Sequence, residues 1–224
     1  MHLHQLTLYS SAPDQLLAFY HNRLGFGIDD SGARHFTLRA GYSLLTFRPS
    51  ERPAYYHFAF NIPGNQIREA RDWLEQRTEL LRDGATAIID FSNWNAEAVY
   101  FADPAGNIVE FIARRDLSLH SSAPFDVSAI EGVSEIGLPV EHVGVSFRRL
   151  HRATGIERYW GDDTHFCAAG DPHGLFIIVD RTSKTWYPSD RPARPFPLEA
   201  SFSALGNQYR LDFSGEQLHV HQKQ

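Results

Sequence analysis

The sequence has little cysteine, no basic run and no long apolar segment. Cys167 is the only cysteine in 224 residues, which excludes an intrachain disulfide framework and fits a reducing cytoplasm. No uninterrupted stretch approaches the roughly 20 apolar residues of a membrane-spanning helix. The first residues, MHLHQLTLYSS, lack the charged and apolar regions of a secretory signal. The sequence therefore predicts a cytoplasmic protein without a membrane partner.

The charge of the chain is mildly negative. The formal net charge is −6 at pH 7, and the lysines and arginines do not cluster. Because nucleic-acid binding and membrane-surface binding both rely on a basic patch, neither partner is expected. A hydrophobic content of 42% with 21% charged residues is typical of a globular protein. The length suits one large domain or two small ones.

One order of elements is repeated along the chain. Residues 3–9 alternate as a strand, a helix ends at Gly25, and three short strands follow up to Phe47. The same order of strand, helix and three strands recurs between Tyr56 and Ala113. Self-similarity at a spacing of about 50–60 residues indicates an array of one supersecondary unit.

Two further copies of the unit follow. A strand at 133–140 and a helix at 141–154 begin a third copy, and the strands between Leu198 and Val220 form a degenerate fourth copy with no room for a helix. The sequence therefore predicts an α+β fold of tandem βαβββ modules. The predicted organisation is a pair of modules at 1–115, a linker at 116–132 and a degenerate pair at 133–224.

Glu110 is the polar residue that fits this pattern least well. It lies in an apolar strand directly after a turn, 103–107, and a buried carboxylate is costly unless a cation receives it. Two interpretations are open. Glu110 lies on a solvated face or pairs with Arg114 or Arg115, or it is a metal ligand or general base inside a cup-shaped sheet.

Two motifs resemble those of the vicinal oxygen chelate superfamily, whose members include glyoxalase I, extradiol ring-cleaving dioxygenases and bleomycin-binding proteins. The first motif is F-Y-x-x-x-L-G-F at 19–26, and the second is Y-F-x-D-P-x-G-N-x-V-E-F at 100–111. The resemblance implies two half-barrel, cup-shaped sheets, each made from paired modules. It also implies a small-molecule substrate and allows a homodimer. It does not name the reaction, because one fold can host unrelated chemistries.

The resemblance places metal ligands on the first and last strands of the modules, at positions that hold Gln5, His57 and Glu110. This donor set suits a divalent ion such as Zn, Ni, Mn or Fe. Three protein ligands leave room for a substrate with two neighbouring oxygens. His57 could instead be a buried histidine that donates to a backbone carbonyl, and Gln5 could simply hydrogen-bond its neighbours.

Other positions of the pattern are not filled by the usual residues. The last-strand position of the first module falls on Leu45, next to Thr46, which leaves Glu110 to serve as ligand or as base. Glyoxalase-type proton transfer needs a carboxylate base near the metal, and extradiol ring cleavage relies on two histidines and one carboxylate. The third module holds Glu135 and Ile178 at the two positions, so no intact site is expected there.

Three functions remain compatible with the sequence. The first, which we expect, is a metal-dependent lyase, isomerase or related enzyme, less readily a dioxygenase, in which Glu110 or a water moves the proton. The second is a metal-free binding or resistance protein, and the third is a scaffold whose site has decayed. In the first two the substrate or ligand is expected to contact Tyr42, Thr46, Trp94 and Tyr100.

Overall fold

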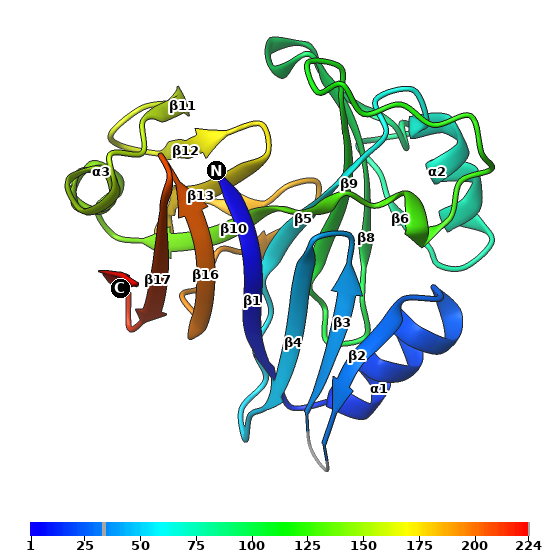
Figure 1. Cartoon of the computed structure of the whole chain (residues 1–224), viewed down its shortest axis with the longest axis horizontal. Coiled ribbons are helices and arrows are strands. Elements are labelled where there is room, and N and C mark those ends of the chain that lie inside the picture. Colours follow the sequence, from blue (N-terminus) through cyan, green and yellow to red (C-terminus); the bar gives the residue numbers. More distant parts are fainter. Residues whose placement is uncertain (33–34, 224) are drawn as a thin grey trace.

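The computed structural model describes residues 1–32 and 35–223, and most of its strands lie in two large curved sheets (Figure 1). The predicted α+β fold of tandem βαβββ modules is confirmed. No helix in the described part of the chain is long and apolar enough to span a membrane.

The first module follows the predicted order. Pro13 lies at the start of its helix, where the missing backbone N–H costs nothing, and Gly25 follows the helix with a φ of 84° that favours glycine. A π-helical turn, η1, continues the short α-helix. The elements are β1 (His2–Ser10), α1 (Pro13–Leu17), η1 (Ala18–Arg23), β2 (Gly27–Ser31), β3 (Phe36–Ala40) and β4 (Ser43–Pro49).

The second module contains the turn before Glu110. Asp103 accepts hydrogen bonds from the backbone N–H groups of Ala105 and Asn107, both at 3.0 Å, and thereby fixes the tight connection between the last two strands. The elements are β5 (His57–Ile62), α2 (Ile67–Glu75), β6 (Leu80–Leu81), β7 (Ile89–Phe91), η2 (Ser92–Trp94), β8 (Ala96–Ala102) and β9 (Ile108–Arg114).

The third module is complete, and the fourth consists of strands alone, as predicted: none of the described residues from 198 to 223 is helical. A short ribbon, β14–β15, lies in the segment between them. The elements are η3 (Val127–Ala129), β10 (Gly132–Val140), α3 (Val143–Thr154), β11 (Arg158–Gly161), β12 (Phe166–Asp171), β13 (Gly174–Asp180), β14 (Thr185–Trp186), β15 (Arg191–Pro192), β16 (Leu198–Ala204), β17 (Asn207–Ser214) and β18 (Gln217–Gln222).

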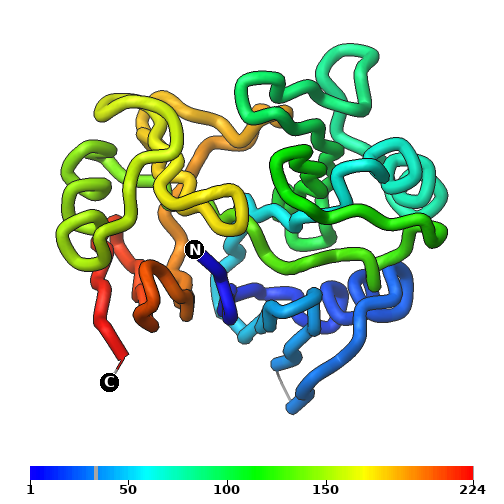
Figure 2. Tube along the Cα trace, turned by 45° about the horizontal axis from the view of Figure 1, so that its top comes forward, coloured from blue at the N-terminus to red at the C-terminus, as the bar shows by residue number. Residues whose placement is uncertain are grey.

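The modules pair in a way that differs from the sequence prediction. Sheet A, with the order β18-β17-β16-β1-β4-β3-β2, joins the first module to the fourth. Sheet B, with the order β11-β12-β13-β10-β5-β9-β8-β6, joins the second to the third. Figure 2 shows the blue N-terminal and red C-terminal segments together on one side of the molecule. The cup therefore does not lie within residues 1–115, because β5 pairs with β10 from beyond the linker.

Alternation along the strands of sheet B gives it two different faces. Phe58, Phe60 and Phe111 are fully buried in the main core with residues of sheet A, so this face packs inward. His57, Ala59 and Glu110, which have the opposite parity, face the other way. This second face forms the concave surface of a cup.

Candidate functional site

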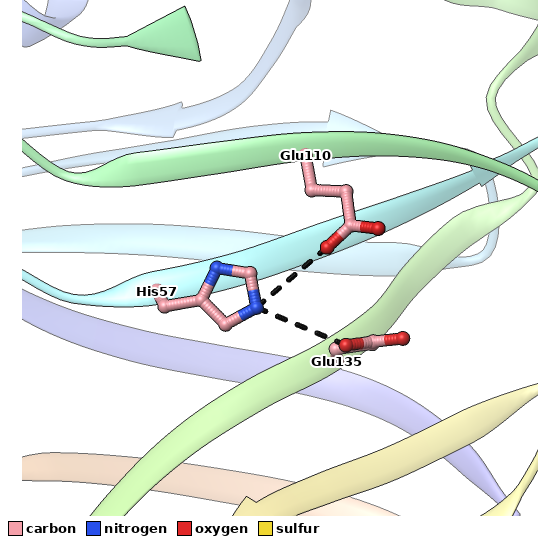
Figure 3. Close-up of side chains that lie close together, drawn as sticks. All are labelled: His57, Glu110 and Glu135. Carbon is pink, nitrogen blue, oxygen red and sulfur yellow. Dashed lines mark ion pairs between the residues drawn. The ribbon is translucent and has the colours of Figure 1, made fainter. Parts of the chain in front are cut away.

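Three strands of sheet B bring His57, Glu110 and Glu135 together at the bottom of the cup (Figure 3). Glu110 on β9 and Glu135 on β10 lie opposite the same residue, Ala59 of the central strand β5, and His57 precedes that residue by two positions. His57 Nε2 is 3.7 Å from Glu110 Oε2 and 3.8 Å from Glu135 Oε2. All three side chains are buried.

A backbone contact on the far side of the ring fixes the orientation of His57. Its Nδ1 lies 3.1 Å from the carbonyl oxygen of Ile108, and a carbonyl can only accept a hydrogen bond. This contact assigns one proton to Nδ1, so Nε2, which faces the two carboxylates, carries the second proton of the imidazolium and has a free lone pair once that proton leaves. Histidine ligands of metals are commonly held in this way by a second hydrogen bond.

The two carboxylates and the imidazole shift one another's proton affinity. Burial, together with the charge of Glu135, raises the pKa of Glu110 from 4.5 to about 8. Burial acts to lower the pKa of His57, but the two glutamates outweigh it, and the pKa is raised above its ordinary value of 6.5. When the glutamates of this cluster lose their protons, two negative charges lie close together in a buried place. A cation at the centre of the cluster would balance them.

Glu135 is also held by a buried cation. Arg114 Nη2 donates to Glu135 Oε1, and Arg114 Nε donates to Asn61 Oδ1 at 3.3 Å. The amide of Asn61 in turn donates to the carbonyl oxygen of Pro172 at 2.9 Å. Because Arg114 occupies one oxygen of Glu135, the other oxygen is the one that faces His57.

The three ligand atoms fit a single divalent ion. They lie within 4.8 Å of one another, and no other group of three such residues in the described chain does so. Two ligands that share an ion at about 2.0–2.2 Å stand about 3–4 Å apart, close to the distances within this group. One nitrogen and two carboxylate oxygens suit a hard or borderline ion.

The site opens into a cavity of about 490 Å³. A cavity of this size accommodates a small organic molecule. Seven of the residues that line it are aromatic, and part of the wall comes from the segment after β13. The aromatic lining consists of Phe91, Trp94, Tyr100, Trp160, Phe166, Trp186 and Tyr187.

The structure brings together some of the sequence-predicted site residues and separates others. His57 and Glu110 lie side by side, and Trp94 and Tyr100 line the same cavity. Gln5, Thr46 and Tyr42 belong to the other half of the molecule. Gln5 is exposed on β1 of sheet A, Thr46 bonds to Thr37 on the neighbouring strand, and the Tyr42 hydroxyl donates to the carbonyl oxygen of His173.

Sheet A repeats the register of the sheet B cup with other residues. Thr7 of β1 lies opposite both Thr46 of β4 and Glu199 of β16, and Gln5 precedes it by two positions. Gln5, Thr46 and Glu199 therefore occupy the positions of His57, Glu110 and Glu135. The strand position assigned to Gln5 from the sequence is correct, but it belongs to the other cup.

Glu199 in this second cup already has partners. The hydroxyl of Tyr9 donates to its Oε1 at 2.7 Å, and Arg210 lies 3.1 Å from its Oε2. Arg48 is a further cation at 3.7 Å. With its carboxylate neutralised and a glutamine and a threonine beside it, the sheet A cup lacks the donor set that sheet B offers.

Glu135 is the site residue that sequence analysis discounted. The sequence places Glu135 at the first-strand ligand position of the third module but places an isoleucine, Ile178, at the last-strand position. An isoleucine cannot bind a metal, so no intact site was predicted there. The register shows that the equivalent position is Ile177, which lines the cavity, whereas Ile178 belongs to the core. The useful signal was a charged residue, Glu135, inside a first strand that is otherwise uncharged.

The fold is shared with solved structures of proteins described as a dioxygenase and as glyoxalase I. A candidate dioxygenase from Bacillus subtilis has a similar structure, with a TM-score of 0.63 and 16% identity over 99% of this chain and 84% of that chain. Two variants of glyoxalase I from Zea mays give TM-scores of 0.57 and 0.55 at 11% identity, over 98% and 94% of this chain and 91% and 88% of theirs. No family model matches the sequence, and no curated protein does.

Proposed function

We propose that the protein is a divalent-metal-dependent enzyme, of the lyase, isomerase or dioxygenase type, that acts on a small molecule with two neighbouring oxygens. His57, Glu110 and Glu135 hold the ion in the cup of sheet B. The observation that carries this proposal is the convergence of these three buried side chains from three strands on one point of a cavity. The similarity in fold to glyoxalase I is consistent with it.

When bound, the ion would hold both substrate oxygens and stabilise negative charge that develops on them. The residues of the chain supply the remaining requirements. Burial raises the pKa of Glu110 to about 8 in the cup without an ion, and because this carboxylate borders the cavity it is the group placed to take a proton from a bound substrate. Tyr100 lies opposite Glu110 on β8 and borders the cavity beside it. Trp186 packs on His57, with ring centroids 5.1 Å apart, and shields the cup from water.

Metal loading tests this proposal directly. Protein purified without a chelating tag is expected to take up about one ion per chain when offered Mn, Fe, Ni or Zn, because one three-residue site is present in the described chain. His57→Ala is expected to lose that ion and to keep its circular dichroism spectrum. Elemental analysis after desalting measures both. Less than about a tenth of an ion in the wild type for every metal would contradict the proposal.

The aromatic lining favours a second candidate function, a metal-free protein that binds a planar molecule. Arg114 already neutralises Glu135, so the cup can exist without an ion. In that case a flat ligand would stack on side chains such as Trp94 and Tyr100. Ligand binding that is unchanged by a chelator, in protein shown to contain no metal, would favour this function over the first.

A further inference from the structure

The charges buried around the cup do not cancel once an ion is present. His57 is neutral when it binds through Nε2, and Glu110 and Glu135 together balance a doubly charged cation. Arg114 then adds one positive charge, and its side chain is only 1% exposed. A buried charge without a counter-charge is costly, so the loaded cup favours a ligand with one negative charge.

Two unused hydrogen-bond donors point to the same kind of ligand. Within the described structure, Arg114 Nη1 and Trp186 Nε1 are buried and have no hydrogen-bond partner. The guanidinium of Arg114 lies 5.3 Å from the ring centre of Trp94, and both tryptophans line the cavity. Buried donors are normally satisfied, and a ligand rich in acceptor oxygens would satisfy Trp186 Nε1, which lines the cavity. Arg114 does not line the cavity and would act on the ligand through its charge.

The walls restrict the shape of that ligand. The aromatic lining and the apolar side chains of β9 and β13, Ile112, Ile177 and Val179, form the larger part of the wall around the ligand residues. The remaining lining residues are polar and exposed to solvent: Asp90, Ser92, Asn93, Lys184 and Thr185. Mostly apolar walls favour a flat, largely apolar ring over a flexible polar chain, because rings gain both burial and stacking.

We propose that the cup selects a planar, singly negative ligand with two neighbouring oxygens, and that Arg114 is the residue that selects for the negative charge. This inference rests on the proposed function, because the balance of charges includes the metal ion. Arg114 acts through its charge and through the carboxylate of Glu135, which it holds.

Salicylate and salicylamide test the inference, since they share a ring and a hydroxyl group and differ by one charge. Protein loaded with Mn²⁺ is expected to bind salicylate at least about tenfold more tightly than salicylamide, as measured by calorimetry. Arg114→Gln is expected to bring the two affinities to within about threefold of each other by weakening salicylate binding, whereas Arg114→Lys keeps the preference. Arg114→Met is the second neutral variant in case the glutamine variant does not fold.

Arg115→Gln is the matched control, because Arg115 follows Arg114 in sequence but is about half exposed and pairs with Glu97. The preference of Arg115→Gln for salicylate over salicylamide is expected to equal that of the wild type. Wild-type protein that binds Mn²⁺ without preferring salicylate, or neutral variants that keep the full preference, would overturn the inference and leave the proposed function intact. Wild-type protein that binds no Mn²⁺, as seen by electron paramagnetic resonance before any ligand is added, would overturn both.

Discussion

Replacing Glu135 with glutamine is expected to weaken Mn²⁺ binding by more than about 100-fold, because even the loss of a residue that supports a ligand costs about 10–100-fold. Glutamine keeps the size of the side chain and an acceptor for Arg114, so the buried network survives while the ligand loses its charge. Gln5→Ala is expected to leave Mn²⁺ binding unchanged, since Gln5 is exposed in sheet A. Titration followed by electron paramagnetic resonance measures both affinities.

The contrast between these two variants decides which modules form the site. A large loss in Gln5→Ala with little change in Glu135→Gln would restore the pairing of the first two modules that the sequence suggested. Glu199→Gln serves as the matched control, because Glu199 occupies the equivalent register position in sheet A. Its Mn²⁺ affinity is expected to equal that of the wild type, since Arg210 and Tyr9 already engage this carboxylate.

The sequence was sufficient to predict each module, because a module is defined by local signals. Strand alternation, the helix that ends at Gly25 and the turn at 103–107 are all read within a few residues, and the structure reproduces them. Alternation also puts His57 on the strand face opposite to Phe58 and Phe60, which is a local property of the strand. The resemblance to the vicinal oxygen chelate superfamily, and not alternation, assigned His57 and Glu110 to one site, and the pairing of β5 with β9 brings them together.

The pairing of modules could not be read in this way. Every module begins with an apolar strand that can pair antiparallel with another first strand, and β1 and β10 are equivalent in this respect. Whether β5 pairs with one or the other depends on packing between segments more than 70 residues apart in sequence, as in the pairing of Ala59 with Glu135. Gln5 was therefore assigned to the wrong cup, and Glu135 was discounted for the same reason.

Metal-free protein carrying Glu110→Gln is expected to be more stable than the wild type above about pH 8, by about 2 kcal/mol. The native state raises the pKa of Glu110 from 4.5 to about 8, so it binds the proton more tightly than the unfolded chain does. Wild-type stability therefore falls as pH rises through that interval, and the raised pKa of His57 extends the fall above 6.5. Urea unfolding between about pH 5 and 9 measures the slope, which the neutral glutamine should reduce.

Glu97→Gln on the adjacent strand β8 is the control, because Glu97 is partly exposed and pairs with Arg115, and its stability curve is expected to follow that of the wild type. Saturating Mn²⁺ should reverse the trend in the wild type, since the ion binds the deprotonated carboxylates and its stabilisation grows as protons leave. Glu110→Gln should show little of this reversal. Parallel stability curves for wild type and Glu110→Gln across the whole pH range would contradict this prediction. They would mean that Glu110 does not retain a proton in the native state and that Glu135 does not shift its pKa.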